Sequence, residues 1–149
     1  MNEYLRRYAR QTRSRGGAIT FVAVDPTRPT EILGYYTISP GAVDFSSVPP
    51  DLTKGLGHHE VPVFRLGRLA VRRDLQGHGL GTELLLAAGA RCLSAAAEVG
   101  GVALAIDAKD ERSATWYEKK HGALRLLDDP LKLFLPLETI AQALKSARR

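Results

Sequence analysis

Gln76-Gly77-His78-Gly79-Leu80-Gly81-Thr82 joins two segments of different character in this 149-residue sequence. An apolar run at 66–71 precedes it, and a segment rich in Leu and Ala follows it at 83–99. This order predicts a strand, a glycine-rich turn and a helix, with several free backbone N–H groups at the helix N-terminus. Such a terminus carries about half of a positive elementary charge and binds phosphate. Because glycine lets a backbone approach a ligand closely, we expect a site for a phosphate-bearing cofactor here.

The spacing of the glycines distinguishes between three classes of phosphate site. A P-loop has a lysine after its second glycine, and none follows Gly79 or Gly81. A dinucleotide-binding fingerprint reads Gly-x-Gly-x-x-Gly, whereas the spacing here is Gly77-x-Gly79-x-Gly81. The remaining pattern is Gln76-x-x-Gly79-x-Gly81, after a strand in which Gly67 predicts a bulge or a close backbone approach.

The rest of the chain predicts one domain over residues 1–149 that mixes helices and strands. Apolar and β-branched runs predict strands at 18–24, 31–39, 61–71, 102–106, 124–127 and 132–135. Apolar periodicity predicts helices at 2–14, 79–99, 111–120 and 138–147. A bend is expected at Pro40-Gly41, with the strand continued at 42–45 beyond it, and Pro62 predicts an edge or splayed position. The sum is a mixed α/β fold in which helices cover one sheet and the central crossover is right-handed.

The composition of the chain indicates which partners are possible and which cellular compartment is expected. The net charge of +5 permits polyanionic partners without requiring them. The single cysteine, Cys92, excludes an internal disulfide and favours a reducing compartment, so we expect a cytoplasmic protein. Among helix alanines, Cys92 is expected to be a small core residue rather than a nucleophile. No apolar run approaches the roughly 20 residues of a membrane span, and the histidines do not suggest a metal site.

The pattern Gln76-x-x-Gly79-x-Gly81 resembles the coenzyme A-binding motif of the GNAT acetyltransferases. Residues 106–123 are similar to that family's strand, Asp-rich bend and short helix with a tyrosine. The resemblance implies the GNAT fold, which has a single, mostly antiparallel central sheet with a splayed parallel pair and helices on both faces. It also implies acetyl-CoA as the cofactor. Its pyrophosphate would bind the loop and its pantetheine arm the splayed strand, with contacts from Leu69, Ala70, Val71, Gln76, Gly77, His78, Gly79, Leu80, Gly81 and Thr82.

Three further stretches are similar to one branch of this family, the GNAT toxins of bacterial toxin–antitoxin modules (the TacT/AtaT group): 34–43, 66–71 and 131–137. This resemblance implies an enzyme that acetylates the α-amine of aminoacyl-tRNA and blocks translation. It also implies a ribbon-helix-helix antitoxin as partner, and a homodimer is expected. Residues 2–9 resemble the helix that follows the family's first strand, so we expect a single GNAT domain that lacks the family's N-terminal segment.

The resemblance makes Tyr117 the general acid that protonates the leaving thiolate. A phenol with a pKa near 10 is protonated at neutral pH and is able to donate. The alternative is a core aromatic residue whose hydroxyl is bound elsewhere. Trp116 is expected to pack, and a main-chain N–H within 69–71 to polarise the thioester carbonyl. Glu60 and His59 are weak candidates for a general base and are expected to be loop residues.

Arginines are the candidates for binding tRNA phosphates. Three of them share one face of the predicted first helix and four lie near the glycine loop: Arg6, Arg10, Arg13, Arg65, Arg68, Arg72 and Arg73. The first three also suit a plain solvated helix face, and Arg68 and Arg73 also suit the phosphates of the cofactor. Two other functions remain open at this point. One is a GNAT enzyme for a small amine or a protein N-terminus, and the other is an inactive coenzyme A-binding module that acts through a protein partner.

Overall fold

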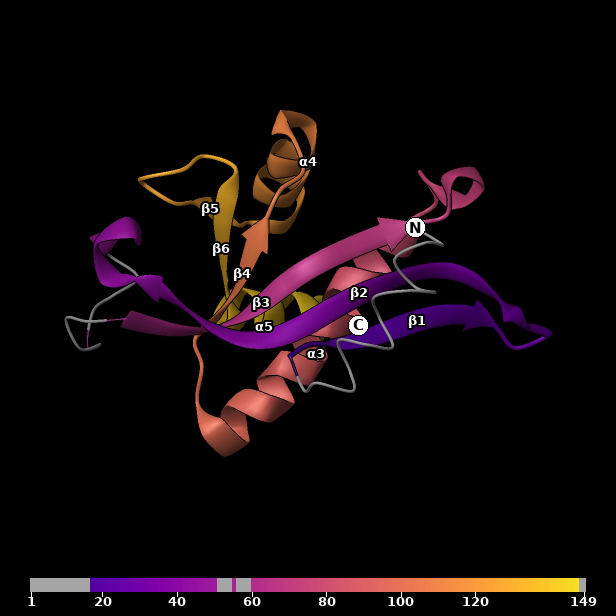
Figure 1. Cartoon of the computed structure of the whole chain (residues 1–149), viewed down its shortest axis with the longest axis horizontal. Helices are drawn as coiled ribbons and strands as arrows, with labels where there is room; N and C mark the ends of the chain where they lie inside the picture. Colours follow the sequence, from indigo (N-terminus) through magenta and orange to yellow (C-terminus); the bar gives the residue numbers. More distant parts are fainter. Residues whose placement is uncertain (1–16, 51–54, 56–59, 148–149) are drawn as a thin grey trace.

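The structure of the chain is a computed structural model that describes residues 17–50, 55 and 60–147. The predicted helix at 2–14 lies outside the described residues, and so do Arg6, Arg10, Arg13 and His59. The described part is built on one six-stranded sheet with the strand order β1-β2-β3-β4-β6-β5 (Figure 1). The strands are β1 (Ile19–Asp25), β2 (Arg28–Asp44), β3 (Glu60–Val71), β4 (Ala103–Asp107), β5 (Leu124–Arg125) and β6 (Lys132–Pro136).

Every neighbouring pair of strands is antiparallel except β3 and β4, which are parallel. The predicted sheet, mostly antiparallel with one parallel pair, is therefore confirmed. The helical elements connect and cover these strands: η2 (Phe45–Ser47), η4 (Arg73–Leu75), α3 (Leu80–Val99), α4 (Glu111–Thr115), η5 (Trp116–Lys120) and α5 (Leu137–Ala147). The helix predicted at 111–120 is thus divided, because η5 is a π-helical turn.

The larger core cluster lies on the sheet face that α3 covers. Leu84, Leu85 and Ala88 of α3 pack there with Ile106 of β4 and Ile140 of α5. α3 is long and apolar enough to meet the length and composition of a membrane span, in contrast to the sequence expectation. A core helix meets the same criterion, and here the apolar stripe of α3 is buried against the sheet. The opposite face carries a smaller cluster, formed by Val48, Val61, Val63, Ala103, Ala105, Leu126 and Phe134.

β3 and β4 run side by side only briefly and then diverge. They pair from Val63 with Ala103 to Leu66 with Ile106. Beyond Leu66, β3 continues along β2 as far as Val71, whereas β4 ends at Asp107, and the two arrows in Figure 1 point apart. The divergence starts at the predicted bulge, since Leu66 pairs with Ile38 and Arg68 with Thr37, which leaves Gly67 as the extra residue. A bulge bends its strand, and this one directs the end of β3 away from β4.

The two proline predictions hold in part, because β4 does not yet pair with β3 at Pro62 and β2 continues beyond Pro40-Gly41. Pro62 lies in the central strand β3 and pairs with Ala42 of β2. It is tolerated there because pairing with β4 begins one residue later, and the Pro62 carbonyl still accepts the Val102 N–H at 3.0 Å. The bend expected at Pro40-Gly41 does not interrupt β2, which stays paired with β3 up to Asp44.

Candidate active site

A groove of about 690 Å³ opens where β3 and β4 diverge. That volume is within the range of cofactor and small-molecule sites. One wall is the second half of β3 followed by the glycine loop, and the other is the end of β4 followed by α4 and η5. Segments that are far apart in the sequence therefore meet across this groove, where the two parallel strands separate.

The glycine loop gives the groove an anion-binding end. Gly77 and Gly79 have φ of 85° and 88°, the left-handed region that other residues rarely adopt. Gly79 is the N-cap of α3, and no side chain caps this helix. A Cβ at either glycine would meet nothing within 4 Å, so the space in front of the loop is open. The first N–H groups of α3 thus face a space that fits a phosphate group.

The predicted loop contacts fall into three groups. Gly77, Gly79, Gly81 and Thr82 line the groove, whereas His78 and Leu80 are not part of its lining. Gln76 also lines it, but its side-chain amide donates to the Val71 carbonyl at 3.1 Å. Gln76 therefore ties the loop to the end of β3. Its role is to hold the loop in place.

Leu69, Ala70 and Val71, which are predicted to contact the cofactor, form the strand wall of the groove. Each pairs with β2 along one edge, through Tyr36, Tyr35 and Gly34. Along the other edge this segment has no strand partner among the described residues, because the pairing of β3 with β4 ends at Leu66. Apart from the Val71 carbonyl, which Gln76 binds, the main-chain groups on this edge are therefore available to a bound molecule. This is the arrangement that an extended pantetheine arm and a polarised thioester carbonyl require.

Tyr117 lies in the π-helical turn η5 and lines the groove from the other wall. Its side chain is 7% exposed, and burial raises the pKa of its phenol to about 12. The hydroxyl is therefore protonated throughout the physiological range. Within the described residues no hydrogen bond holds this hydroxyl, so the alternative of a hydroxyl bound elsewhere finds no support there.

Trp116 connects Tyr117 to the phosphate loop. Its ring meets the Tyr117 ring edge-on at 4.9 Å and the His121 ring at 4.5 Å. A Cβ on Gly81 would lie 3.5 Å from the Trp116 ring, so this glycine allows the helix and the loop to approach. The expected packing role of Trp116 is confirmed, and the residue also lines the groove. Burial lowers the pKa of His121, whose Nε2 lies 3.4 Å from the Thr82 hydroxyl.

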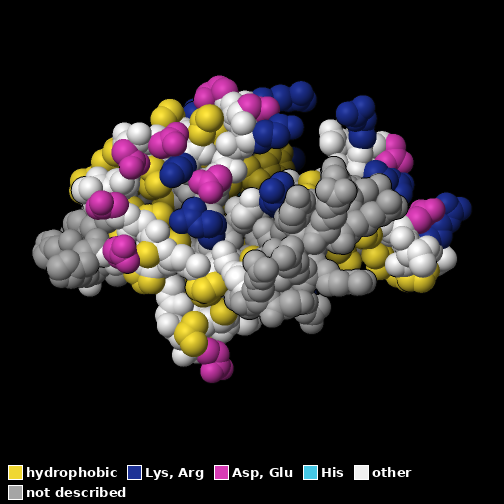
Figure 2. All heavy atoms as spheres, viewed as in Figure 1, with side chains coloured by type: hydrophobic (Ala, Val, Ile, Leu, Met, Phe, Trp, Pro, Cys, Tyr) yellow, Lys and Arg dark blue, Asp and Glu magenta, His cyan; other side chains and the backbone are white. Residues whose placement is uncertain are grey.

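Sequence reasoning missed the charged residues on the β4 side of the groove. Asp107, Lys109, Arg112 and Lys120 all line it. In Figure 2, Lys and Arg side chains gather along the upper edge of the molecule, over α4 and η5 and over the turn after β3. A usable signal was present, because these residues follow a strand end, and ligands bind beyond the carboxyl ends of parallel strands.

The predicted arginines do not form one surface in the described part of the chain. Arg68 lines the groove, and Arg73 begins η4 beside the glycine loop. Arg72 is bound to Asp74 at 2.6 Å and to Glu31 at 3.6 Å. The hydrogen bond with Asp74 raises the pKa of Arg72, and its charge is already compensated. Arg65 is absent from the groove lining and pairs with Asp107 at 3.4 Å.

The positions of Glu60 and Cys92 decide whether either residue is able to act in catalysis. Glu60 begins β3, at the opposite end of the strand from the groove, so a role as general base is excluded by distance. Cys92 is 1% exposed inside α3, and burial raises the pKa of its thiol to about 11. It is a core residue, as predicted. Among the described residues no group of three or more His, Cys, Asp or Glu is placed to hold a metal ion.

Known proteins resemble this chain in sequence and in fold. The family model described as the acetyltransferase (GNAT) family matches residues 2–123. A tRNA-acetylating toxin from Mycobacterium tuberculosis is 33% identical over 117 residues, which cover 78% of this chain and 68% of that protein.

Solved structures agree with these sequence matches. The structure of AtaT complexed with acetyl-methionyl-tRNAfMet matches with a TM-score of 0.88 at 27% identity, over 96% of this chain and 85% of that one. A tyrosine-to-phenylalanine variant of KacT matches with a TM-score of 0.84 at 25% identity, over 95% and 84%. AtaTR bound with AcCoA matches with a TM-score of 0.79 at 27% identity, over 96% and 84%.

Proposed function

The chain belongs to the acetyltransferase (GNAT) family, and from this we propose that it transfers the acetyl group of acetyl-CoA to the α-amine of aminoacyl-tRNA. One observation carries the proposal. The groove joins an uncapped glycine loop, suited to a pyrophosphate, to the protonated hydroxyl of Tyr117, which no other described residue binds. The acceptor is inferred from the relatives, a tRNA-acetylating toxin and AtaT complexed with acetyl-methionyl-tRNAfMet.

Each wall of the groove has a part in this reaction. The N–H groups of residues 77–82 would hold the pyrophosphate, and the free edge of 69–71 would hold the arm that carries the thioester. Lys109, Arg112 and Lys120 add positive charge along the opposite wall, where further phosphates of the cofactor or the tRNA would bind. The bound cofactor supplies an activated acetyl group.

The transfer needs little covalent help from the protein. The neutral α-amine attacks the thioester carbonyl carbon, the C–N bond forms, the C–S bond breaks, and the nitrogen loses its extra proton to water. Tyr117 donates its phenolic proton to the departing sulfur and is reprotonated from solvent. A main-chain N–H of 69–71 stabilises the negative charge that develops on the carbonyl oxygen. Alignment of the two reactants contributes much of the rate enhancement.

The biological setting follows from the same relatives. An acetylated aminoacyl-tRNA has no free α-amine for peptide-bond formation, so the enzyme would block translation as a cytoplasmic toxin. AtaT has been solved bound to the C-terminus of the antitoxin AtaR. We therefore expect an antitoxin partner of the ribbon-helix-helix type and a homodimeric enzyme.

The direct test is to incubate the pure protein with acetyl-CoA and a pool of charged tRNA. The tRNA is then digested with nuclease, and the aminoacyl-adenosine products are analysed by mass spectrometry. An N-acetylated aminoacyl-adenosine supports the proposal. Acetylation of polyamines or peptides with none on tRNA would overturn it, and so would coenzyme A binding without turnover.

A further inference from the structure

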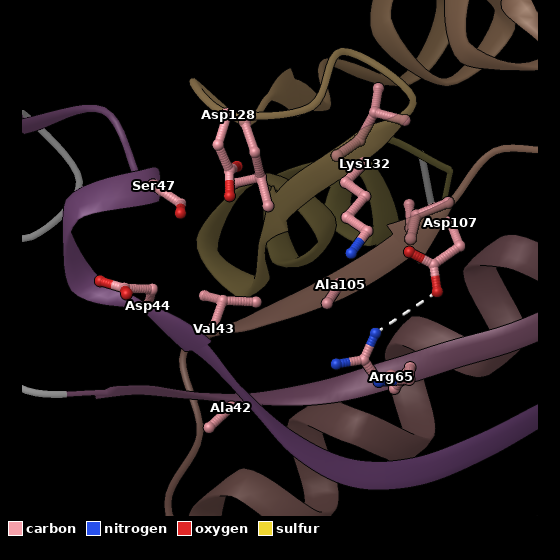
Figure 3. Close-up of a pocket in the computed structure, with 12 residues that line it drawn as sticks. Ala42, Val43, Asp44, Ser47, Arg65, Ala105, Asp107, Asp128 and Lys132 are labelled. Atoms are coloured by element: carbon pink, nitrogen blue, oxygen red, sulfur yellow. Dashed lines mark hydrogen bonds and ion pairs between the residues drawn. The ribbon is translucent and has the colours of Figure 1, made fainter.

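A second cavity, of about 170 Å³, lies on the other side of the point where β3 and β4 separate (Figure 3). Side chains alternate between the two faces of a strand. Leu66 and Ile106 belong to the core cluster on the α3 side, whereas Ala105 belongs to the cluster on the opposite face. Arg65 and Asp107 share the opposite face with Ala105, and both line the second cavity. This cavity and Tyr117 are therefore approached from different faces of the sheet.

The second cavity and the groove meet at Asp107. Asp107 is one residue beyond the last pair of the parallel strands, Leu66 with Ile106, and it lines both spaces. Its carboxylate accepts a hydrogen bond from Arg65 at 3.4 Å and is about half exposed. An amine held beside this carboxylate would lie at the gap between the strands. From there it would face the thioester that the groove holds.

Half of the residues that line the second cavity are charged or polar. Lys132 pairs in register with Asp107, and Figure 3 shows its ammonium group directed into the cavity beside Arg65. Asp44, Ser47 and Asp128 line the opposite side. Hydrogen bonds from Ser46 lower the pKa of Asp44, which keeps that carboxylate ionised. The apolar half of the lining consists of Ala42, Val43, Ala105, Ile106, Leu126 and Leu133.

We propose that this cavity receives the amino acid of the acceptor and selects side chains that are small or form hydrogen bonds over large aliphatic and aromatic ones. A large apolar side chain would remove Lys132, Asp128 and Asp44 from water without replacing their hydrogen bonds, which is costly. A small side chain leaves water on these groups, and a polar one bonds to them. This selection rests on the proposed acetylation of aminoacyl-tRNA and adds the class of amino acid to it.

The test compares several amino acids on one and the same tRNA, so that recognition of the tRNA body does not vary. A single tRNA is charged chemically with Gly, Ser, Asn, Leu, Met or Phe, and kcat/KM is measured by mass spectrometry of the acetylated aminoacyl-adenosine. We expect Gly, Ser and Asn to exceed Leu, Met and Phe by at least tenfold. Equal or higher values for Leu, Met and Phe would overturn the selection and leave the proposed function intact. Absence of acetylation on all six would instead contradict the proposed function.

A variant tests the cavity itself. Lys132→Met removes one charge and adds apolar surface, so the Ser-to-Leu ratio of kcat/KM should fall at least fivefold. Lys145→Met is the matched control, because Lys145 is exposed on α5 and lines neither space, and its ratio should equal that of the wild type. An unchanged ratio in Lys132→Met, with coenzyme A affinity retained, would show that the second cavity does not select the amino acid. If Lys132→Met does not fold, the comparison of six amino acids on the wild type decides the matter alone.

Discussion

Tyr117 is the residue whose chemistry is most sharply defined by its surroundings. Burial raises its pKa, its hydroxyl is held by no hydrogen bond among the described residues, and Trp116 fixes the ring against the phosphate loop. The residue lines the groove, which an acceptor and a cofactor would share. Tyr117 therefore packs in the core and also lines the groove, where its hydroxyl is able to donate to a bound ligand.

Replacing Tyr117 by Phe should lower turnover at least tenfold, because the leaving sulfur loses its proton donor. Coenzyme A affinity, measured by calorimetry, should stay near that of the wild type. Tyr36→Phe is the matched control: it removes a buried phenolic hydroxyl that accepts from Arg91 at 2.8 Å and that lies outside the groove. Its turnover should be unchanged. Unchanged turnover in Tyr117→Phe would remove this residue from the mechanism.

The direction of the Tyr117 pKa shift also predicts the pH profile. A raised pKa keeps the phenol protonated, so the acid form is lost only as the pH approaches about 12. The acceptor amine, with an ordinary α-amino pKa of about 7.7–8.0, must instead be neutral to react. We therefore expect kcat/KM to rise about tenfold per pH unit below that pKa and to level off above it.

This profile is measured between pH 6 and 9.5 on an amide-linked aminoacyl-tRNA, which does not hydrolyse. Tyr117→Phe should keep the same rise on the acid side, because the substrate amine is responsible for it. A fall in rate with a midpoint below pH 9.5 would show that the essential acid is not a phenol in this environment.

At the scale of elements, the sequence predicts the parts that depend on local patterns. β-branched runs marked the strands, apolar periodicity marked α3 and α5, and Gly67 marked the bulge. The left-handed backbone conformation at Gly77 and Gly79 could also be predicted, because a positive φ favours glycine. These features need only a few neighbouring residues, and so they can be predicted from sequence.

Features that depend on register between distant segments were not predicted. Arg65 pairs with Asp107, and Arg72 with Glu31, only because β3 has a particular alignment with β4 and β2. These pairings could not be read from the order of the arginines in the sequence, and the predicted role of the arginines in binding tRNA stays a prediction. The second cavity was missed in the same way, since its lining comes from β2, β3, β4, β6 and the segment before β6.

The contact between α3 and α5 supplies a prediction about stability. Gly89 of α3 is buried under Ile140 of α5, and a Cβ there would clash with Ile140 Cγ2 and lie 3.1 Å from Cδ1. Gly89→Ala adds helix propensity of up to about 1 kcal/mol but overpacks the contact by about 1–3 kcal/mol. We expect a net loss of about 1 kcal/mol in the free energy of unfolding by urea.

Two matched variants separate the opposing effects in Gly89→Ala. Ala90→Gly, at an exposed position of the same helix, reports the propensity difference alone. Gly89→Ala combined with Ile140→Ala should be more stable than the sum of the two single changes predicts, because the smaller residue makes room. Strict additivity in this double-mutant cycle would mean that the two positions do not contact.

At the scale of the whole molecule, the charge distribution matches a polyanionic acceptor. The net charge is +5, and Arg68, Lys109, Arg112 and Lys120 line a single groove. Side chains that neutralise phosphates release counterions, so the affinity for tRNA should fall steeply with salt. With about three or four such contacts, raising KCl from 50 to 200 mM should increase KM for aminoacyl-tRNA by roughly 50- to 150-fold.

The control for this salt dependence is an acceptor with few phosphates, such as an aminoacyl-adenosine carrying the same amino acid. Its KM should change only a few-fold over the same range, because the amino acid and the cofactor are bound as before. Lys120→Gln should lower the slope for tRNA by about one unit and leave the slope for the small acceptor unchanged. Equal slopes for both acceptors in the wild type would mean that the tRNA phosphates contribute nothing. Recognition would then rest on the aminoacyl end alone, which the second cavity and Asp107 are placed to bind.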